Sequence, residues 1–89
     1  MSSARLVFSS DGVRPLASLD AGGRATIVDL VRHDDGRMHR LMALGVTRGA
    51  QVTVLQTFPG VVFLCDQTEL AVERDVAEGI LVRPLEGTS

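Results

Sequence analysis

Aromatic residues are scarce in this chain of 89 residues: tryptophan and tyrosine are absent, and the only aromatics are Phe8, Phe58 and Phe63. Peptide-binding modules of the SH3 type line their grooves with aromatic side chains that hold proline-rich ligands. Three phenylalanines cannot easily build such a groove, so this class of function is disfavoured. Apolar residues still make up 45% of the sequence, which predicts an aliphatic core, and the β-branched runs favour strands.

Lysine is absent too, and the chain has no excess of positive charge. The formal net charge is −2, and the nine basic residues, all arginine, are scattered along the sequence. A nucleic-acid-binding domain of this size normally carries a basic excess gathered into a patch. We therefore expect no nucleic-acid partner.

Cysteine and long apolar runs are also nearly missing. The single cysteine, Cys65, cannot form an internal disulfide, and its place in the apolar run Val61–Cys65 predicts a small buried side chain. No stretch approaches the ~18–20 apolar residues of a membrane span. The N-terminus lacks the continuous apolar region of a signal peptide. These features predict a cytoplasmic protein that does not insert into the membrane.

The sequence also shows no recognisable set of catalytic residues. A nucleophile needs a base and an orienting group, but His33 and His39 are not near Cys65 in the sequence, and the carboxylates are scattered. No phosphate-binding glycine loop occurs. His33, Asp34, Asp35 and His39 could offer metal ligands, yet their spacing matches no fixed zinc or iron pattern. We expect neither an enzyme nor a resident cofactor or metal, with His33 and His39 as weak metal candidates.

The order of apolar runs and turn residues predicts a mainly β domain. Residues 1–13 form an extension, either a short strand or a flexible arm, and residues 85–89 form a tail. Between them, Pro15 opens a turn or a single helical coil, and Asp75–Gly79 reads as one helical turn capped by Asp75. The period-two runs predict five strands: Arg24–Val31, Gln51–Thr57, Val61–Cys65, Glu69–Glu73 and Ile80–Arg83. Such short strands with tight turns are typical of a small antiparallel barrel.

The most informative stretch runs from Arg37 to Val54. Apolar residues at helical spacing predict a helix from Arg37 to Leu44, with Asp34 or Asp35 as its N-cap. Gly45 follows where a left-handed helix end favours glycine, and Gly49 marks a second bend. Two helical turns cannot persist alone in water, so Leu41 and Leu44 are expected to pack against the sheet.

This stretch carries a family resemblance. The motif formed by Arg40-Leu41, Leu44-Gly45-Val46, Gly49 and the alternating valines after it resembles the FeoA family, and similar segments extend from about Arg14 to Pro84. The resemblance implies an SH3-like barrel in a small cytoplasmic protein that accompanies the ferrous iron permease FeoB. It therefore implies a non-enzymatic accessory of ferrous iron transport, which binds the cytoplasmic GTP-binding part of FeoB. The sequence departs from the family pattern at Arg48, where proline is common, and at Asp66-Gln67, where a hairpin lacks glycine.

The surface nearest this motif is the expected partner site. It comprises Arg37, Arg40, Leu41, Met42, Leu44, Gly45 and Gly49, with Arg74 as an addition. Arginines on a short helix can fork to carboxylates of a partner, and both Arg37 and Arg40 are expected to face solvent. Leu41 and Leu44 are expected to belong to the core and to support this surface indirectly.

A second hypothesis is regulatory. Iron-dependent repressors carry a similar SH3-like domain after their DNA-binding region, so the chain could be a free-standing metal-responsive module related to that C-terminal domain. It has no room for a winged helix of its own. The sequence leaves the oligomeric state open, a homo-oligomer included.

Overall fold

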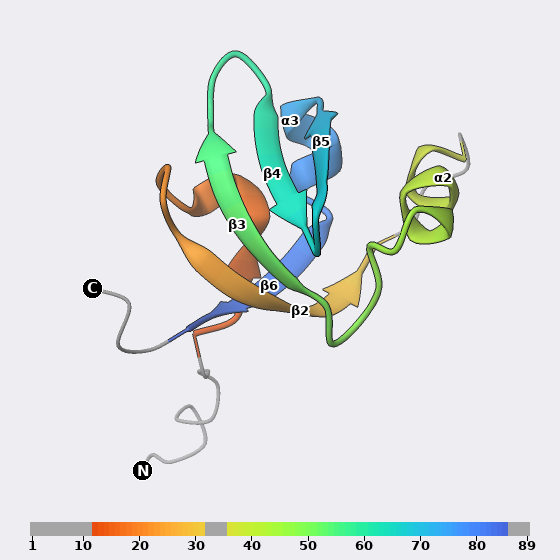
Figure 1. Ribbon diagram of the computed structural model, residues 1–89, viewed down its shortest axis with the longest axis horizontal. Coiled ribbons are helices and arrows are strands. Elements are labelled where there is room, and N and C mark those ends of the chain that lie inside the picture. Colours follow the sequence, from red (N-terminus) through yellow and green to blue (C-terminus); the bar gives the residue numbers. More distant parts are fainter. Residues whose placement is uncertain (1–11, 32–35, 86–89) are drawn as a thin grey trace, which may run out of the picture.

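The computed structural model describes residues 12–31 and 36–85, which form one six-stranded antiparallel sheet (Figure 1). The strands are β1 (Arg14–Pro15), β2 (Arg24–Leu30), β3 (Gln51–Gln56), β4 (Val61–Cys65), β5 (Thr68–Val72) and β6 (Ile80–Pro84). Between them lie the 3-10 turn η1 (Leu16–Ser18) and the helices α2 (Arg37–Ala43) and α3 (Arg74–Ala77). Each predicted strand and helix is present to within two residues of its expected bounds, and the short β1 is an addition.

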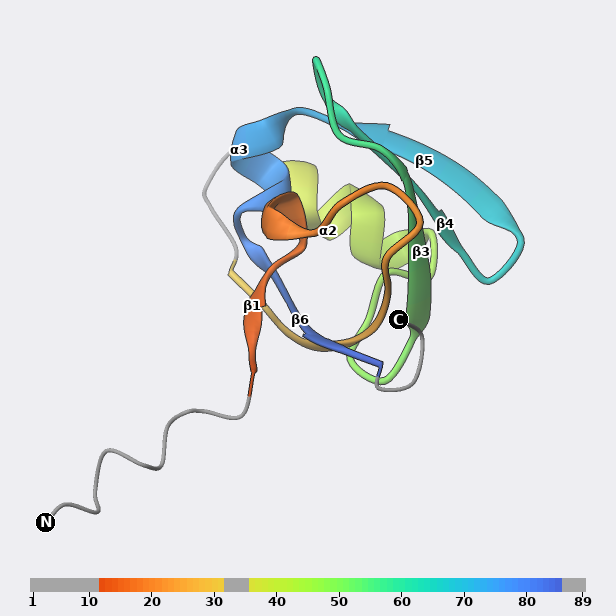
Figure 2. The same cartoon turned by 90° about the vertical axis from the view of Figure 1, so that its left-hand side faces the viewer.

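The sheet curls around an aliphatic core. Its strand order is β1-β6-β2-β3-β4-β5, so β1 and β5 are its two edges, and within the described residues the sheet does not close (Figure 2). Phe63 is the largest fully buried side chain, and Leu16, Ile27 and Ile80 lie in the same core cluster. Cys65 is buried as expected. Burial, and to a lesser degree Asp66, raises the pKa of its thiol, which keeps it protonated and unreactive.

The strand β2 is central, so both of its edges are hydrogen-bonded, while the burial of its side chains alternates. It lies between β6 and β3, and its pairing with β6 shifts register between Ile27 and Asp29. The turn before β3 docks on this irregular stretch: the Gly49 amide donates to the Ile27 carbonyl at 2.8 Å, and the Ile27 amide donates to the Ala50 carbonyl at 2.9 Å. Gly49 has φ +90°, a conformation that favours glycine.

The end of α2 is a Schellman motif. The Gly45 amide donates to the Met42 carbonyl and the Val46 amide to the Leu41 carbonyl, each at 3.1 Å. Gly45 has φ +104°, which confirms its predicted role. The same motif pairs the side chains of Leu41 and Val46 on the core side, and both are buried. The chain is thereby turned from the helix toward β3.

Both predictions about helix N-caps differ from the structure. The N-cap of α2 is Gly36, with φ +81° and no side-chain cap, while Asp34 and Asp35 lie outside the described residues. The N-cap of α3 is Glu73, again without a side-chain cap, and Asp75 instead lies in the first turn. Its carboxylate pairs with Arg37 at 3.1 Å.

The turn between β4 and β5 contains no glycine, and an aspartate takes the positive φ in its place. The turn is Asp66-Gln67, and Asp66 takes φ +58°, the only positive φ of a non-glycine residue among the described ranges. Aspartate tolerates this region better than most side chains. The departure from the family pattern therefore leaves the hairpin intact.

Candidate functional site

In the view of Figure 1, β5 lies between β4 and the helix α2. Two side chains of α2, Met38 and Leu41, belong to the core cluster and are only 2% and 8% exposed. Leu44 is 56% exposed, so the expectation that it packs in the core is wrong. It is the C-cap residue, and in a Schellman motif the flanking positions make the core contact. A large apolar side chain is thereby presented to solvent.

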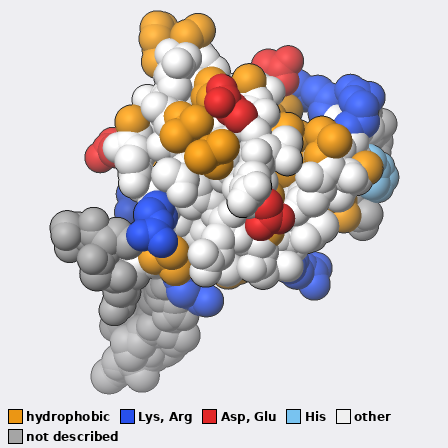
Figure 3. Space-filling view, viewed as in Figure 1, with side chains coloured by type: hydrophobic (Ala, Val, Ile, Leu, Met, Phe, Trp, Pro, Cys, Tyr) orange, Lys and Arg blue, Asp and Glu red, His pale blue; other side chains and the backbone are white. Residues whose placement is uncertain are grey.

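Between α2 and the edge of the sheet lies a hollow of about 320 Å³, here named the α2–β5 groove. Its α2 wall carries Leu41 and Leu44, and the opposite wall is β5 with the start of α3. Arginine lies on its rim at Arg37 and Arg40. The remaining lining residues are Leu70, Ala71, Val72, Glu73 and Val76. Figure 3 shows this side of the molecule, where blue basic atoms over α2 border orange apolar ones.

The two arginines of α2 have different roles. The Arg37 guanidinium pairs with Asp75 at 3.1 Å and with Glu73 at 3.4 Å, tying α2 to the start of α3. Its hydrogen bond to Asp75 lowers the pKa of that carboxyl. The expectation that Arg37 simply faces solvent therefore needs correction, because it has partners within the fold.

Arg40, one turn further along, is exposed as expected. Among the residues that the structure describes, no carboxylate pairs with it. It therefore places an available guanidinium beside the apolar groove. Of the predicted site residues, Arg40 and Leu44 combine exposure with a place on the groove.

The other predicted residues fall outside this groove. Met42 is half-buried and faces a second hollow with Asp29, Thr47 and Arg48. Arg48 spans that side by pairing with Asp29 at 3.5 Å. Gly45 and Gly49 act through the backbone, as the end of α2 and the turn docked on β2.

Arg74 is a structural link. Its guanidinium donates to the Thr57 carbonyl and, at 3.4 Å, to the Ala17 carbonyl. These bonds tie α3 to the β3–β4 loop and to η1. The loop beyond Thr57 carries Phe58, 79% exposed, a feature that the sequence reasoning missed. The position of this phenylalanine, next to a proline in a turn, could have indicated its exposure.

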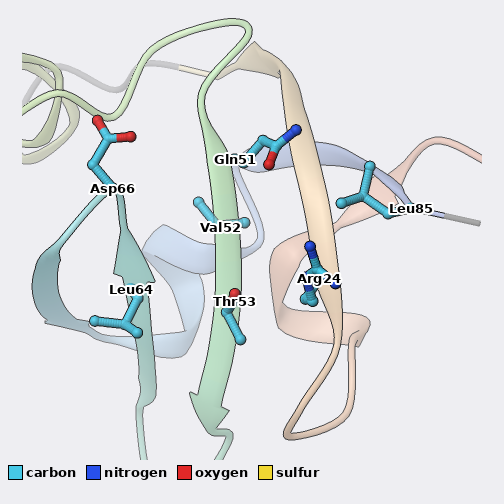
Figure 4. A pocket seen from close by; sticks show the side chains of 7 residues that line it. All are labelled: Arg24, Gln51, Val52, Thr53, Leu64, Asp66 and Leu85. Atoms are coloured by element: carbon cyan, nitrogen blue, oxygen red, sulfur yellow. The ribbon is translucent and has the colours of Figure 1, made fainter. Parts of the chain in front are cut away.

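A further hollow lies over the sheet near the β4–β5 hairpin (Figure 4). It measures about 210 Å³ and is lined by Arg24, Gln51, Val52, Thr53, Leu64, Asp66 and Leu85. In Figure 4, the Asp66 and Gln51 side chains lie toward one end of it, and those of Thr53 and Leu64 lie further along the strands. This surface is polar and lacks a large exposed apolar side chain, so it ranks second as a protein-binding site.

The metal candidates are not gathered by the fold. His33 lies outside the described residues, and His39 is exposed on α2. Within residues 12–31 and 36–85, no three His, Cys, Asp or Glu side chains come together as a metal site would require. None of the described helices is long and apolar enough to cross a membrane.

Comparison with known proteins decides the family. The FeoA domain model matches residues 14–84. The chain belongs to the FeoA family. This membership supports an accessory role in ferrous iron transport. A comparison with curated protein sequences finds no match.

Solved structures agree with this assignment. FeoA from Chlorobium tepidum is 37% identical with a TM-score of 0.74, and the match covers 82% of this chain and 71% of that one. Zinc-complexed FeoA from Stenotrophomonas maltophilia, described as a prokaryotic SH3 domain protein, is 19% identical with a TM-score of 0.64, covering 84% and 93%. The SH3-like fold is thus confirmed, as a barrel-like sheet that does not close within residues 12–31 and 36–85.

The same fold occurs within a larger regulator. A manganese-dependent transcriptional repressor has a TM-score of 0.77 at 16% identity, and the match covers 86% of this chain but only 44% of the repressor. At this identity the likeness shows the fold alone.

Proposed function

We propose that this FeoA protein binds the cytoplasmic GTP-binding part of a FeoB-type permease and that the α2–β5 groove is its docking surface. Family membership supports the transport role. The observation that carries the choice of surface is Leu44, a large apolar side chain that is 56% exposed at the end of a helix. It lies beside the exposed guanidinium of Arg40, which pairs with no carboxylate of the described residues. Interfaces combine apolar anchors with arginine in this way.

Burial and ion pairing indicate a different role for each residue on the α2 side of the groove. Leu41 belongs to the core and fixes the helix, while Leu44 offers apolar area to a partner. Arg37 is held by Glu73 and Asp75, so it positions α2 against α3. Arg40 is available for a partner carboxylate, which a guanidinium can hold through two parallel bonds.

Iron uptake by living cells tests this function. A strain lacking the chromosomal gene would carry the wild-type chain, the Arg40→Glu/Leu44→Glu variant or the Arg83→Glu control, and uptake of labelled ferrous iron would be measured. Arg83 is an exposed arginine on β6, away from the groove. We expect the groove variant to resemble the deletion strain and the control to resemble wild type. Wild-type uptake by a folded groove variant would contradict the proposal.

The regulatory alternative has one supporting observation, the likeness of fold to the repressor domain. It would make the chain a free-standing metal-responsive module. Its test is ferrous or manganous ion binding by the purified protein, measured by calorimetry. Stoichiometric binding in the micromolar range would favour it over the permease accessory.

A further inference from the structure

The two edges of the sheet are not alike. One edge is β1, only the two residues Arg14–Pro15, and proline has no amide hydrogen to offer a neighbouring strand. Short edge strands and proline are common protections against edge pairing. The other edge, β5, has five residues, contains no proline and pairs with β4 without a register shift. It therefore presents a regular edge that pairs with no further strand among the described residues.

The register of the β4–β5 hairpin shows which backbone groups point outward. The Asp66-Gln67 turn is closed by the pair Cys65 and Thr68, and hydrogen-bonded pairs alternate with non-hydrogen-bonded ones along an antiparallel ladder. Leu70 and Val72 consequently bond to β4. The amides and carbonyls of Glu69 and Ala71 point away from β4, at the outer edge of the sheet.

The α2–β5 groove follows this edge. Four consecutive residues, Leu70 to Glu73, line it. Successive side chains of a strand point to opposite faces, so a hollow that touches all of them faces the strand edge rather than either face. The outward groups of Ala71 therefore border the groove, with Leu41 and Leu44 opposite.

We infer that the groove takes an extended segment of the partner, which adds to the sheet as a strand beside β5. Its backbone would pair with the outward amides and carbonyls of β5, an established mode of peptide recognition. An apolar side chain of the segment would meet Leu44, and a carboxylate would pair with Arg40. This inference rests on the proposed function and names the form in which the partner binds.

Hydrogen exchange provides the direct test. Full-length labelled protein would be mixed with the cytoplasmic domain of FeoB from the same organism, and amide exchange along β5 followed by NMR. In the free protein, the Glu69 and Ala71 amides should exchange faster than those of Leu70 and Val72. In the complex, the Ala71 amide should slow by at least about tenfold, because it becomes hydrogen-bonded.

A substitution supplies an independent measurement. Ala71→Pro removes the outward amide without taking a bond from the β4 ladder, and Ala71→Ser is the matched control that keeps it. We expect Ala71→Pro to weaken binding of the FeoB domain at least about tenfold and Ala71→Ser to change it less than about twofold. If the proline variant fails to fold by circular dichroism, the exchange measurement on wild type decides alone.

The outcomes separate the two proposals. No binding of the wild-type chain to the FeoB domain would overturn the proposed function. Binding with an Ala71 amide that still exchanges freely would overturn strand addition and leave the proposed function standing. Protection of Ala71 that depends on protein concentration in the absence of FeoB would assign the edge to a second copy of the chain, and would overturn the inference.

Discussion

Gly45 illustrates at the scale of one residue how the backbone sets the site. An added Cβ would meet no atom within 4 Å, so space is not the constraint there. The constraint is φ +104°, which L side chains rarely adopt. The residue ends α2 and so determines where Leu44 points.

The first prediction concerns this strain. Gly45→Val should lower the free energy of unfolding by about 1–2 kcal/mol or more, since a β-branched residue is strained at positive φ. Ala43→Val, on the exposed face of α2, is the control and should cost only a few tenths of a kcal/mol. Urea denaturation checks both. Equal stabilities of the two variants would show that φ at Gly45 does not matter.

Substitutions at Leu41 and Leu44 should differ in their effect on stability. Leu41→Ala removes a buried side chain and should cost about 2–5 kcal/mol. Leu44→Ala should change stability by less than about 0.5 kcal/mol, because its side chain is mostly exposed. Thermal and urea unfolding of both variants is the measurement. A large loss of stability in Leu44→Ala would place that side chain in the core after all.

At the scale of elements, α2 and α3 are joined by Arg37. The bond from its guanidinium holds the pKa of Asp75 below the usual 3.8. A carboxyl with a lowered pKa in the folded state stabilises the protein above its unfolded pKa, and this contribution is lost as pH falls through the folded value. The contact should therefore matter at neutral pH and vanish in acid.

The corresponding prediction is a change in titration. Arg37→Met should raise the pKa of Asp75 toward 3.8, and Arg40→Met, the matched control on the same helix, should leave it unchanged. NMR titration of the side-chain carboxyl measures this in each variant. An unaltered Asp75 titration in Arg37→Met would mean that the ion pair does not form in solution.

The positions of the strands and helices were the feature best predicted from the sequence. Period-two runs and glycine stops locate the strands and α2, because alternating burial and positive φ leave direct marks on a sequence. The exposure of Leu44 was missed, since helical spacing alone cannot tell a C-cap residue from a core-facing one. Arg37 was also misjudged, because its partners Glu73 and Asp75 are distant in sequence and meet it only in the folded chain.

On the scale of the whole molecule, topology creates the candidate site. Among the described residues the curled sheet ends at β5, and residues of α2 and β5 line one groove. No single motif encodes this arrangement. The groove depends on the order of strands, and sequence reasoning found its α2 wall while missing its β5 wall.

The most direct test of the account is the affinity of the full chain for the cytoplasmic domain of its FeoB, measured by titration calorimetry. We predict that Arg40→Glu/Leu44→Glu remains folded and weakens binding by at least about tenfold, because it replaces a cation and an apolar anchor with negative charge. Arg83→Glu should bind within about twofold of wild type. A folded double variant that binds as tightly as wild type would contradict the account and move the search to the hollow beside Asp66.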